Sequence, residues 1–210
     1  MTRMTIERIC GLAPVIPVLI IDDLSTAVPL ARALVAGGLR ALEVTLRTPV
    51  ALDAIRAIGD AVPDAVVGVG TLRSAADVDA AVAAGARFGV SPGLSAAVLD
   101  TAADAGLPML PGVATPTEAM TAAERGLHIL KFFPAEANGG VSVLKAWNSP
   151  LQDLCFCPTG GLSAGNAPDY LALPNVVCVG GSWVAPKDAV TAGDWARITE
   201  LSRQAFDLSV

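Results

Sequence analysis

Residues 127–136 of the chain read LHILKFFPAE, and Leu127 to Phe133 have the pattern of a buried β-strand that contains one lysine. Successive side chains of a strand point to opposite faces, so Ile129, Lys131 and Phe133 share one face. If both faces are covered, as in a parallel sheet, the Lys131 amine lies in the protein interior. Burial disfavours a charged amine, and a neutral amine is the nucleophile that forms a Schiff base with a ketone. The alternative is a lysine whose amine reaches water at the end of the strand.

The composition is that of a chain with a large aliphatic core and an acidic net charge. Of 210 residues, 53% are hydrophobic, 16% are charged and 4% are aromatic, so many segments must be covered on both sides. The net charge of −6 argues against nucleic acid and anionic membranes as partners, because both need a basic surface. It does not exclude a small anion bound by backbone amides. No apolar run reaches about 18 residues and no signal-peptide core is present, so we expect a cytoplasmic protein.

The cysteines and the single histidine do not have the spacing of a metal site. Cys155 and Cys157 are not a C-x-x-C pair, and His128 is the only histidine. Cys10, Cys155, Cys157 and Cys178 are therefore interpreted as buried free thiols in a reducing compartment.

In both directions from residues 127–136 the same unit repeats: an Ala-rich helix, a glycine and an apolar strand. Gly85, Gly106 and Gly126 have the pattern of left-handed caps that follow helices. The predicted strands are residues 14–21, 39–47, 65–72, 86–91, 108–114, 127–133, 154–159 and 176–181. The predicted helices are residues 2–11, 25–35, 50–61, 75–84, 95–105, 117–125, 141–147, 164–171 and 192–206.

Eight strands that alternate with helices predict parallel pairing with right-handed crossovers. A (β/α)8 barrel, typically of about 250 residues, and an open doubly wound sheet both fit this alternation. The open sheet usually has a glycine-rich loop after its first strand, whereas here that strand ends in Asp22-Asp23. The sequence therefore predicts an α/β fold, a (β/α)8 TIM barrel with an N-terminal capping helix, as a single domain over residues 1–210.

The second predicted strand carries polar side chains on one face. Glu43, Thr45 and Arg47 alternate with aliphatic residues, so the polar set is expected to point into the barrel, near the carboxyl ends of the strands where barrel active sites lie. The interior would then hold a carboxylate, a guanidinium and the Lys131 amine. A structural ion pair is the alternative, but buried ions add little net stability, which favours a functional role.

Glycine pairs lie at the ends of the last two predicted strands: Gly160-Gly161 follows Thr159, and Gly180-Gly181 precedes Ser182. The loops after strands 7 and 8 form the common phosphate site of such barrels, where backbone N–H groups bind the anion. Glycine lets the backbone approach the anion closely, and the two hydroxyls can add hydrogen bonds. One glycine pair usually means only a tight turn, but two at adjacent strand ends indicate an anion site.

Together these motifs resemble the 2-keto-3-deoxy-6-phosphogluconate (KDPG) aldolase family of class I aldolases. The matching pieces span nearly the whole chain: EVTLRT (43–48), GVGTL (68–72), SPG (91–93), PGVATP (111–116), KFFPAE (131–136), PTGG (158–161) and GGSW (180–183). The resemblance implies a homotrimer without metal or organic cofactor. It also implies a lyase of carbohydrate metabolism that cleaves KDPG to pyruvate and glyceraldehyde 3-phosphate in the Entner–Doudoroff pathway. Members often also cleave 4-hydroxy-2-oxoglutarate, which would give pyruvate and glyoxylate.

The resemblance also implies a role for each candidate residue. Lys131 is expected to form the Schiff base and Glu43 to carry protons, through water. The substrate-binding residues are expected to be Arg47 and Thr71 on the pyruvyl carboxylate, Phe133 on the carbon skeleton, Pro92 in the wall of the site, Thr159 on a hydroxyl, and Gly160, Gly161, Gly180, Gly181 and Ser182 on the phosphate.

Three other functions stay open from the sequence. The chain could be the aldolase for the galactonate epimer, although Thr159 favours the gluconate substrate. It could also be a phosphate-binding barrel that works as an isomerase or epimerase through Glu43, or a sugar-phosphate-binding barrel without turnover. Glu136, just after the lysine strand, is expected to cap or orient the neighbouring loop.

Overall fold

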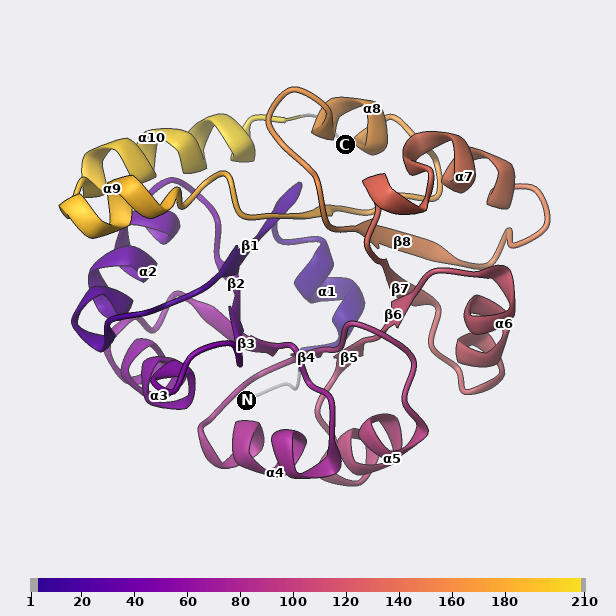
Figure 1. The fold of residues 1–210 in the computed structure, drawn as a ribbon, viewed down its shortest axis with the longest axis horizontal. Coiled ribbons are helices and arrows are strands. Elements are labelled where there is room, and N and C mark those ends of the chain that lie inside the picture. Colours follow the sequence, from indigo (N-terminus) through magenta and orange to yellow (C-terminus); the bar gives the residue numbers. More distant parts are fainter. Residues whose placement is uncertain (1–3, 209–210) are drawn as a thin grey trace.

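A computed structural model describes residues 4–208 as parallel strands with helices around them (Figure 1). The strands are β1 Val15–Leu19, β2 Ala41–Thr45, β3 Val66–Gly70, β4 Gly89–Val90, β5 Met109–Leu110, β6 Gly112–Val113, β7 Ile129–Phe132, β8 Cys155–Pro158 and β9 Val179–Gly181. Each predicted strand overlaps at least one of these, because the runs of Val, Leu and Ile between glycine-capped helices leave few other assignments.

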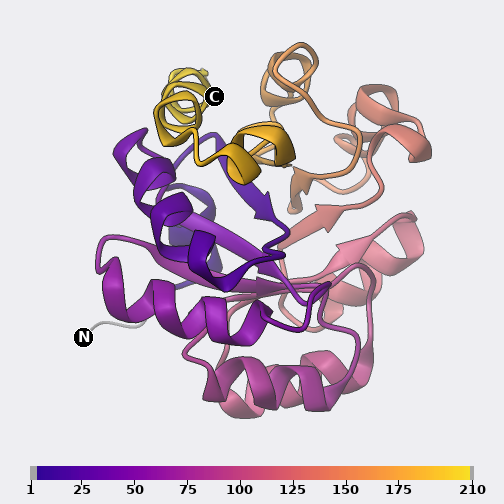
Figure 2. The same cartoon turned by 60° about the vertical axis from the view of Figure 1, so that its left-hand side comes forward.

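Helices α2 to α10 lie outside the strands in both views (Figures 1 and 2), whereas α1 is seen in the middle of Figure 1, surrounded by strands of the two sheets. The helices are α1 Ile6–Cys10, α2 Ala27–Ala36, α3 Ala51–Ala61, α4 Ala75–Ala83, α5 Ala96–Ala105, α6 Pro116–Glu124, α7 Gly140–Trp147, α8 Ala167–Leu171, α9 Lys187–Ala192 and α10 Trp195–Phe206, with short 3-10 helices η1 Leu24–Thr26 and η2 Glu136–Asn138. No helix among residues 4–208 combines the length and the apolarity needed to cross a membrane.

The strands form two parallel sheets. One has the order β5-β4-β3-β2-β1-β9, and the other has the order β6-β7-β8. The predicted α/β fold with parallel strands is confirmed, but the strands are paired as two sheets and not as one ring of eight. Pro111 separates β5 from β6, because proline has no N–H for the hydrogen-bond ladder. Two isolated parallel bridges, Phe156↔Val176 and Thr159↔Gly180, join β8 to the segment around β9.

The helix ends follow the predicted glycines in most places. Gly85, Gly106 and Gly126 all have positive φ, which confirms the predicted left-handed caps. The predicted helix 192–206 is wrong in its first turn: Gly193, with φ of 67°, ends α9, and α10 begins after Asp194, whose side chain accepts a hydrogen bond from the Arg197 N–H. The predicted helix 2–11 is seen as α1, and its residues 2 and 3 lie outside the described residues.

Two groups of apolar side chains hold these layers together. The larger group fills the space between strands and outer helices and includes Leu42 and Leu130. The smaller group lies inside the strands, where Ile9 of α1 packs with residues near the starts of several strands, among them Ile16 and Ile129. Because α1 contributes to this inner group, it closes the end at which the strands begin. The opposite end, at which the strands finish, is left for the polar residues.

Candidate active site

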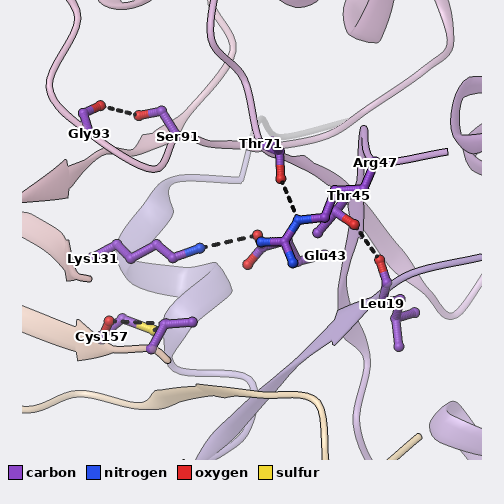
Figure 3. A network of polar contacts seen from close by, with 10 residues as sticks. Leu19, Glu43, Thr45, Arg47, Thr71, Ser91, Gly93, Lys131 and Cys157 are labelled. Atoms are coloured by element: carbon purple, nitrogen blue, oxygen red, sulfur yellow. Dashed lines mark hydrogen bonds and ion pairs between the residues drawn. The ribbon is translucent and has the colours of Figure 1, made fainter. Parts of the chain in front are cut away.

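Lys131 and Glu43 meet inside the molecule from different sheets. Lys131 is on β7 and Glu43 is on β2, and Figure 3 shows their side chains pointing toward one another. The Lys131 Nζ lies 3.3 Å from the Glu43 Oε1, and the two residues are only 4% and 3% exposed. The neighbours of Lys131 in the strand, Leu130 and Phe132, face the helices, as the alternation of side chains requires. The arrangement therefore puts an amine and a carboxylate in contact at a buried position.

The backbone of β3 makes room for the Glu43 side chain. A Cβ at Gly70 would lie 2.7 Å from the Glu43 Cγ and would overlap its Oε1. Beside it on β2, the buried Thr45 hydroxyl donates to the Leu19 carbonyl oxygen at 2.8 Å, which ties β2 to β1. Glycine at position 70 thus fixes where the carboxylate can lie, because any side chain there would displace it.

Arg47 and Thr71 form a second polar contact at the carboxyl ends of β2 and β3. The Arg47 Nε donates to the Thr71 Oγ1 at 3.3 Å (Figure 3). Thr71 has φ of 66°, a strained value for a residue with a β-branched side chain, and such strain is commonly found at functional sites. The prediction that the guanidinium is buried in the interior is wrong, because Arg47 follows the end of β2 by two residues and is exposed, although it lines a pocket at this end of the strands.

A pocket of about 150 Å³ opens at the same end of the strands. Eight of the ten predicted substrate-binding residues line it, together with three apolar residues that the sequence reasoning missed. The lining consists of Arg47, Phe133, Thr159, Gly160, Gly161, Gly180, Gly181 and Ser182, with Val18, Ile20 and Leu162 in addition. The alternation in β1 could have found two of the missed residues, since Val18 and Ile20 share the face of the inward-pointing Ile16.

The ion pair lies beside this pocket and not among its lining residues. The Phe133 ring connects the two, because it lines the pocket and its centroid is 5.2 Å from the Lys131 Nζ. Thr71 and Pro92 are also absent from the lining. Pro92 is exposed, and its carbonyl group lies against Gly112, whose register partner is Lys131. Pro92 is thus separated from the lysine by one strand.

The pocket has the features of an anion site built from backbone. Gly160 and Gly161 have φ of 100° and 81°, values that other residues rarely adopt. Within residues 4–208, the N–H groups of Gly161 and Leu162 donate to no protein acceptor. On the other side, a Cβ at Gly180 would lie 3.0 Å from the Thr159 Cγ2 and would overlap its Oγ1, so the two loops pack closely. Free amides and glycine backbone suit phosphate oxygens.

The cysteines are free, and one of them adjoins the pocket: the Cys157 Sγ lies 4.0 Å from the Thr159 Oγ1. The prediction of burial is wrong for Cys155, which is half-buried. Cys10, Cys157 and Cys178 are buried, and hydrogen bonds to the other two thiols, together with burial, raise the pKa of Cys178. A neutral thiol is a poor nucleophile and a poor metal ligand. His128 is at the surface, with its Nδ1 3.6 Å from an Asp153 carboxylate oxygen. Among residues 4–208, no three His, Cys, Asp or Glu side chains are grouped to hold a metal ion.

A larger cavity, of about 650 Å³, lies at the opposite end, between α1 and the start of β7. None of the predicted site residues lines it. The small pocket is therefore the better candidate for the active site, since the Phe133 ring connects it to the buried ion pair.

Comparison with known proteins places the chain in one family. The sequence model of the family described as "KDPG and KHG aldolase" matches residues 6–201. The chain is 51% identical to a 2-dehydro-3-deoxy-phosphogluconate aldolase of Pseudoalteromonas atlantica, over 97% of this chain and 94% of that protein.

Two solved structures are similar over nearly their whole length. One is the 2-keto-3-deoxy-6-phosphogluconate aldolase of Zymomonas mobilis with 3-phosphoglycerate, with 48% identity and a TM-score of 0.92, covering 97% of this chain and 95% of that one. The other is the KDPG aldolase of Legionella pneumophila with pyruvate captured as a covalent carbinolamine. It has 44% identity and a TM-score of 0.93, and the match covers 96% of this chain and 98% of that one.

Proposed function

The chain belongs to the KDPG and KHG aldolase family, and from this we propose that it is a class I aldolase that cleaves KDPG to pyruvate and glyceraldehyde 3-phosphate. It is thus a carbon–carbon lyase of the Entner–Doudoroff pathway. The observation that carries the proposal is the buried Lys131 amine, 3.3 Å from the Glu43 carboxylate and next to a pocket lined by glycine backbone. A carbinolamine with pyruvate in the Legionella pneumophila relative supports the same chemistry.

In the proposed reaction, the Lys131 Nζ attacks C2 of the substrate and forms a carbinolamine, which loses water to give an iminium ion. Removal of the C4 hydroxyl proton lets the C3–C4 bond break. Its electron pair moves to the iminium, which leaves an enamine, and glyceraldehyde 3-phosphate departs. A proton added at C3 and hydrolysis of the iminium then release pyruvate and restore the amine. Glu43 carries the protons in these steps, because its carboxylate is the acid–base group beside the amine.

The substrate contacts are proposed from the family resemblance, and two of the residues, Thr71 and Pro92, lie outside the lining of the pocket. Arg47 and Thr71 are proposed to bind the pyruvyl carboxylate, with Phe133 against the carbon skeleton and Pro92 in the wall of the site. Thr159 is proposed to bind a substrate hydroxyl. The phosphate is proposed to lie on the backbone of Gly160, Gly161, Gly180 and Gly181 and on the Ser182 hydroxyl. Support comes from the shared pocket of eight of these residues and from the free N–H groups near Gly161.

The same proposal extends to fold and assembly. We propose that residues 1–210 are one domain and that the two sheets belong to one (β/α)8 barrel. The short interruption at Pro111 and the bridges between β8 and the β9 segment support this barrel. A homotrimer and a cytoplasmic location are proposed from the family resemblance, and the absence of disulfides among the four cysteines fits a reducing compartment. Sedimentation analysis checks the trimer.

Borohydride trapping with pyruvate tests the chemistry. The chain has only three lysines, Lys131, Lys145 and Lys187, so mass spectrometry can assign the reduced adduct without ambiguity. We expect one pyruvyl adduct, on Lys131, and none in Lys131→Ala, which should also lose KDPG cleavage. Lys145→Ala, at an exposed position on α7, is the matched control and should keep both. Full cleavage activity in Lys131→Ala would falsify the Schiff-base role. An adduct without KDPG cleavage would contradict the proposed substrate.

A further inference from the structure

In the loop that follows β8, the first three carbonyl oxygens, those of residues 159–161, each accept a hydrogen bond from another part of the protein. The Thr159 oxygen accepts from the Ala135 N–H at 2.8 Å, and the Gly160 oxygen accepts from the Glu136 N–H at 3.1 Å. The Gly161 oxygen accepts from the Asn166 Nδ2 at 3.2 Å. Since these oxygens are fixed by scaffold donors, they are kept away from an anion in the pocket.

The side chain of Glu136 supports the same loop. A Cβ at Gly161 would lie 2.7 Å from the Glu136 Cβ and 2.6 Å from its Cγ, so the glycine backbone rests on these two carbon atoms. The carboxylate itself lies elsewhere: its Oε1 accepts a hydrogen bond from the Tyr170 hydroxyl and is near Gly140 at the start of α7. Neither Tyr170 nor Gly140 lines the phosphate pocket. The charge of Glu136 is therefore held behind the loop while its carbon atoms support it.

Tyr170 is well placed to hold this carboxylate. It is on α8, has no exposed surface, and is the only tyrosine in the chain. Burial, with the hydrogen bond and the negative charge of Glu136, raises the pKa of Tyr170, so the hydroxyl stays a donor at any physiological pH. Burial therefore keeps the Tyr170 hydroxyl protonated and holds its ring in one position.

We propose that Glu136 and Tyr170 are positioning residues for phosphate recognition: the tyrosine hydroxyl holds the carboxylate behind the loop, and the glutamate side chain fixes the backbone of Gly161. This inference rests on the proposed function, because it assigns the pair to the phosphate end of the same substrate. Neither residue contacts the reacting carbon atoms. Loss of the pair should therefore weaken binding of phosphate and leave the chemistry at Lys131 intact.

Calorimetry with inorganic phosphate and steady-state kinetics with KDPG test this pair. Tyr170→Phe removes only the hydroxyl, and Glu136→Ala removes the carboxylate and its Cγ. Both variants should bind phosphate about five- to ten-fold more weakly, which is the size of one typical hydrogen bond. The KM for KDPG should rise by the same factor with kcat little changed. Glu136→Gln, which keeps an acceptor oxygen and both carbon atoms, should restore both values to within about two-fold of the wild type.

Pyruvate has no phosphate group, so borohydride trapping of pyruvate on Lys131 measures the chemistry of the lysine separately from phosphate binding. The trapping rate should be unchanged in all three variants. Glu124→Ala, an exposed glutamate on α6, is the matched control and should change nothing. Equal losses in pyruvate trapping and phosphate affinity would point to general disruption and overturn the proposal, as would unchanged phosphate affinity in Tyr170→Phe. A wild-type protein that binds phosphate without trapping pyruvate would refute the aldolase reaction instead. In that case the phosphate affinities of the wild type and the variants would still decide the role of Glu136 and Tyr170.

Discussion

Glu43 is buried with its Oε1 3.3 Å from the Lys131 Nζ, so a single atom exchange tests its part in proton transfer. Glu43→Gln keeps the size of the side chain and an acceptor oxygen for the amine, but it removes the proton-carrying carboxylate. We expect kcat for KDPG cleavage to fall by about 10²-fold or more. Rapid-quench measurement of each step would show the largest loss in carbinolamine dehydration or enamine protonation. A near-normal kcat would remove Glu43 as the proton carrier.

Gly70 lies beside the same carboxylate and offers a test of its position. In Gly70→Ala the new Cβ would overlap the Glu43 Oε1, and the backbone can accept alanine because φ is not positive there. We expect kcat to drop by about 10²-fold, since a displacement of about 1 Å can cost that much. Circular dichroism would check that the fold is kept. An active Gly70→Ala enzyme would show that the carboxylate can move without loss.

For single residues, the sequence predicted which side chains form the site better than it predicted their exposure and their tertiary contacts. Period-2 alternation placed Lys131 and Glu43 on inward faces, and the structure brings their side chains together. For Arg47 the alternation predicted a side chain that lines the pocket but not its exposure, because β2 ends at Thr45 and Arg47 lies beyond the strand. The link between Tyr170 and Glu136 joins residues 34 positions apart, and no local pattern reports a contact between a helix and a preceding loop.

Among the helices, α3 provides a stability test that is separate from the site. Gly59 is exposed near the end of α3, and a Cβ there would have nothing within 4 Å. Gly59→Ala should stabilise the protein by about 0.5–1 kcal/mol, because alanine loses less conformational entropy than glycine in a helix. Thermal and urea unfolding would measure the gain, and activity should be unchanged. A loss of stability would mean that α3 does not extend through residue 59. The variant also serves as the control for Gly70→Ala.

The elements that could be predicted are those with a local signal at each end. A capping box starts α6, where the Thr115 hydroxyl accepts from the Glu118 N–H and the Glu118 carboxylate accepts from the Thr115 N–H, and a left-handed Gly126 follows the end of the same helix. The division at Pro111 was not predicted, although proline is a signal against a continuous strand. The register between distant strands, such as Gly112 with Lys131, depends on tertiary packing and has no local signal.

At the scale of the molecule, the two ends of the strands differ in composition: one is polar and holds the pocket, and the other is apolar and packed. The end at which the strands finish has the polar pocket, the strained Thr71 and the free amides near Gly161. The end at which they begin is filled by the inner apolar group and covered by α1. The sequence predicted an N-terminal capping helix at residues 2–11, and Ile6, Ile9 and Cys10 are the buried residues of α1. This division predicts that stability and catalysis can be changed separately.

Ile9 tests the separation because it has no exposed surface and packs into the inner group from α1. Ile9→Ala should leave a cavity among side chains that come from both sheets, so the free energy of unfolding should fall by about 2–5 kcal/mol. Urea denaturation would measure this as a lower midpoint with an unchanged slope. Met120→Ala, at a side chain that is 55% exposed on α6, is the matched control and should stay within about 0.5 kcal/mol of the wild type.

At temperatures where Ile9→Ala is folded, kcat and KM for KDPG should match the wild type, because the helix lies at the far end from Lys131. A stable Ile9→Ala protein would mean that α1 is not part of the cooperative core, and a folded but inactive one would mean that the two ends are coupled.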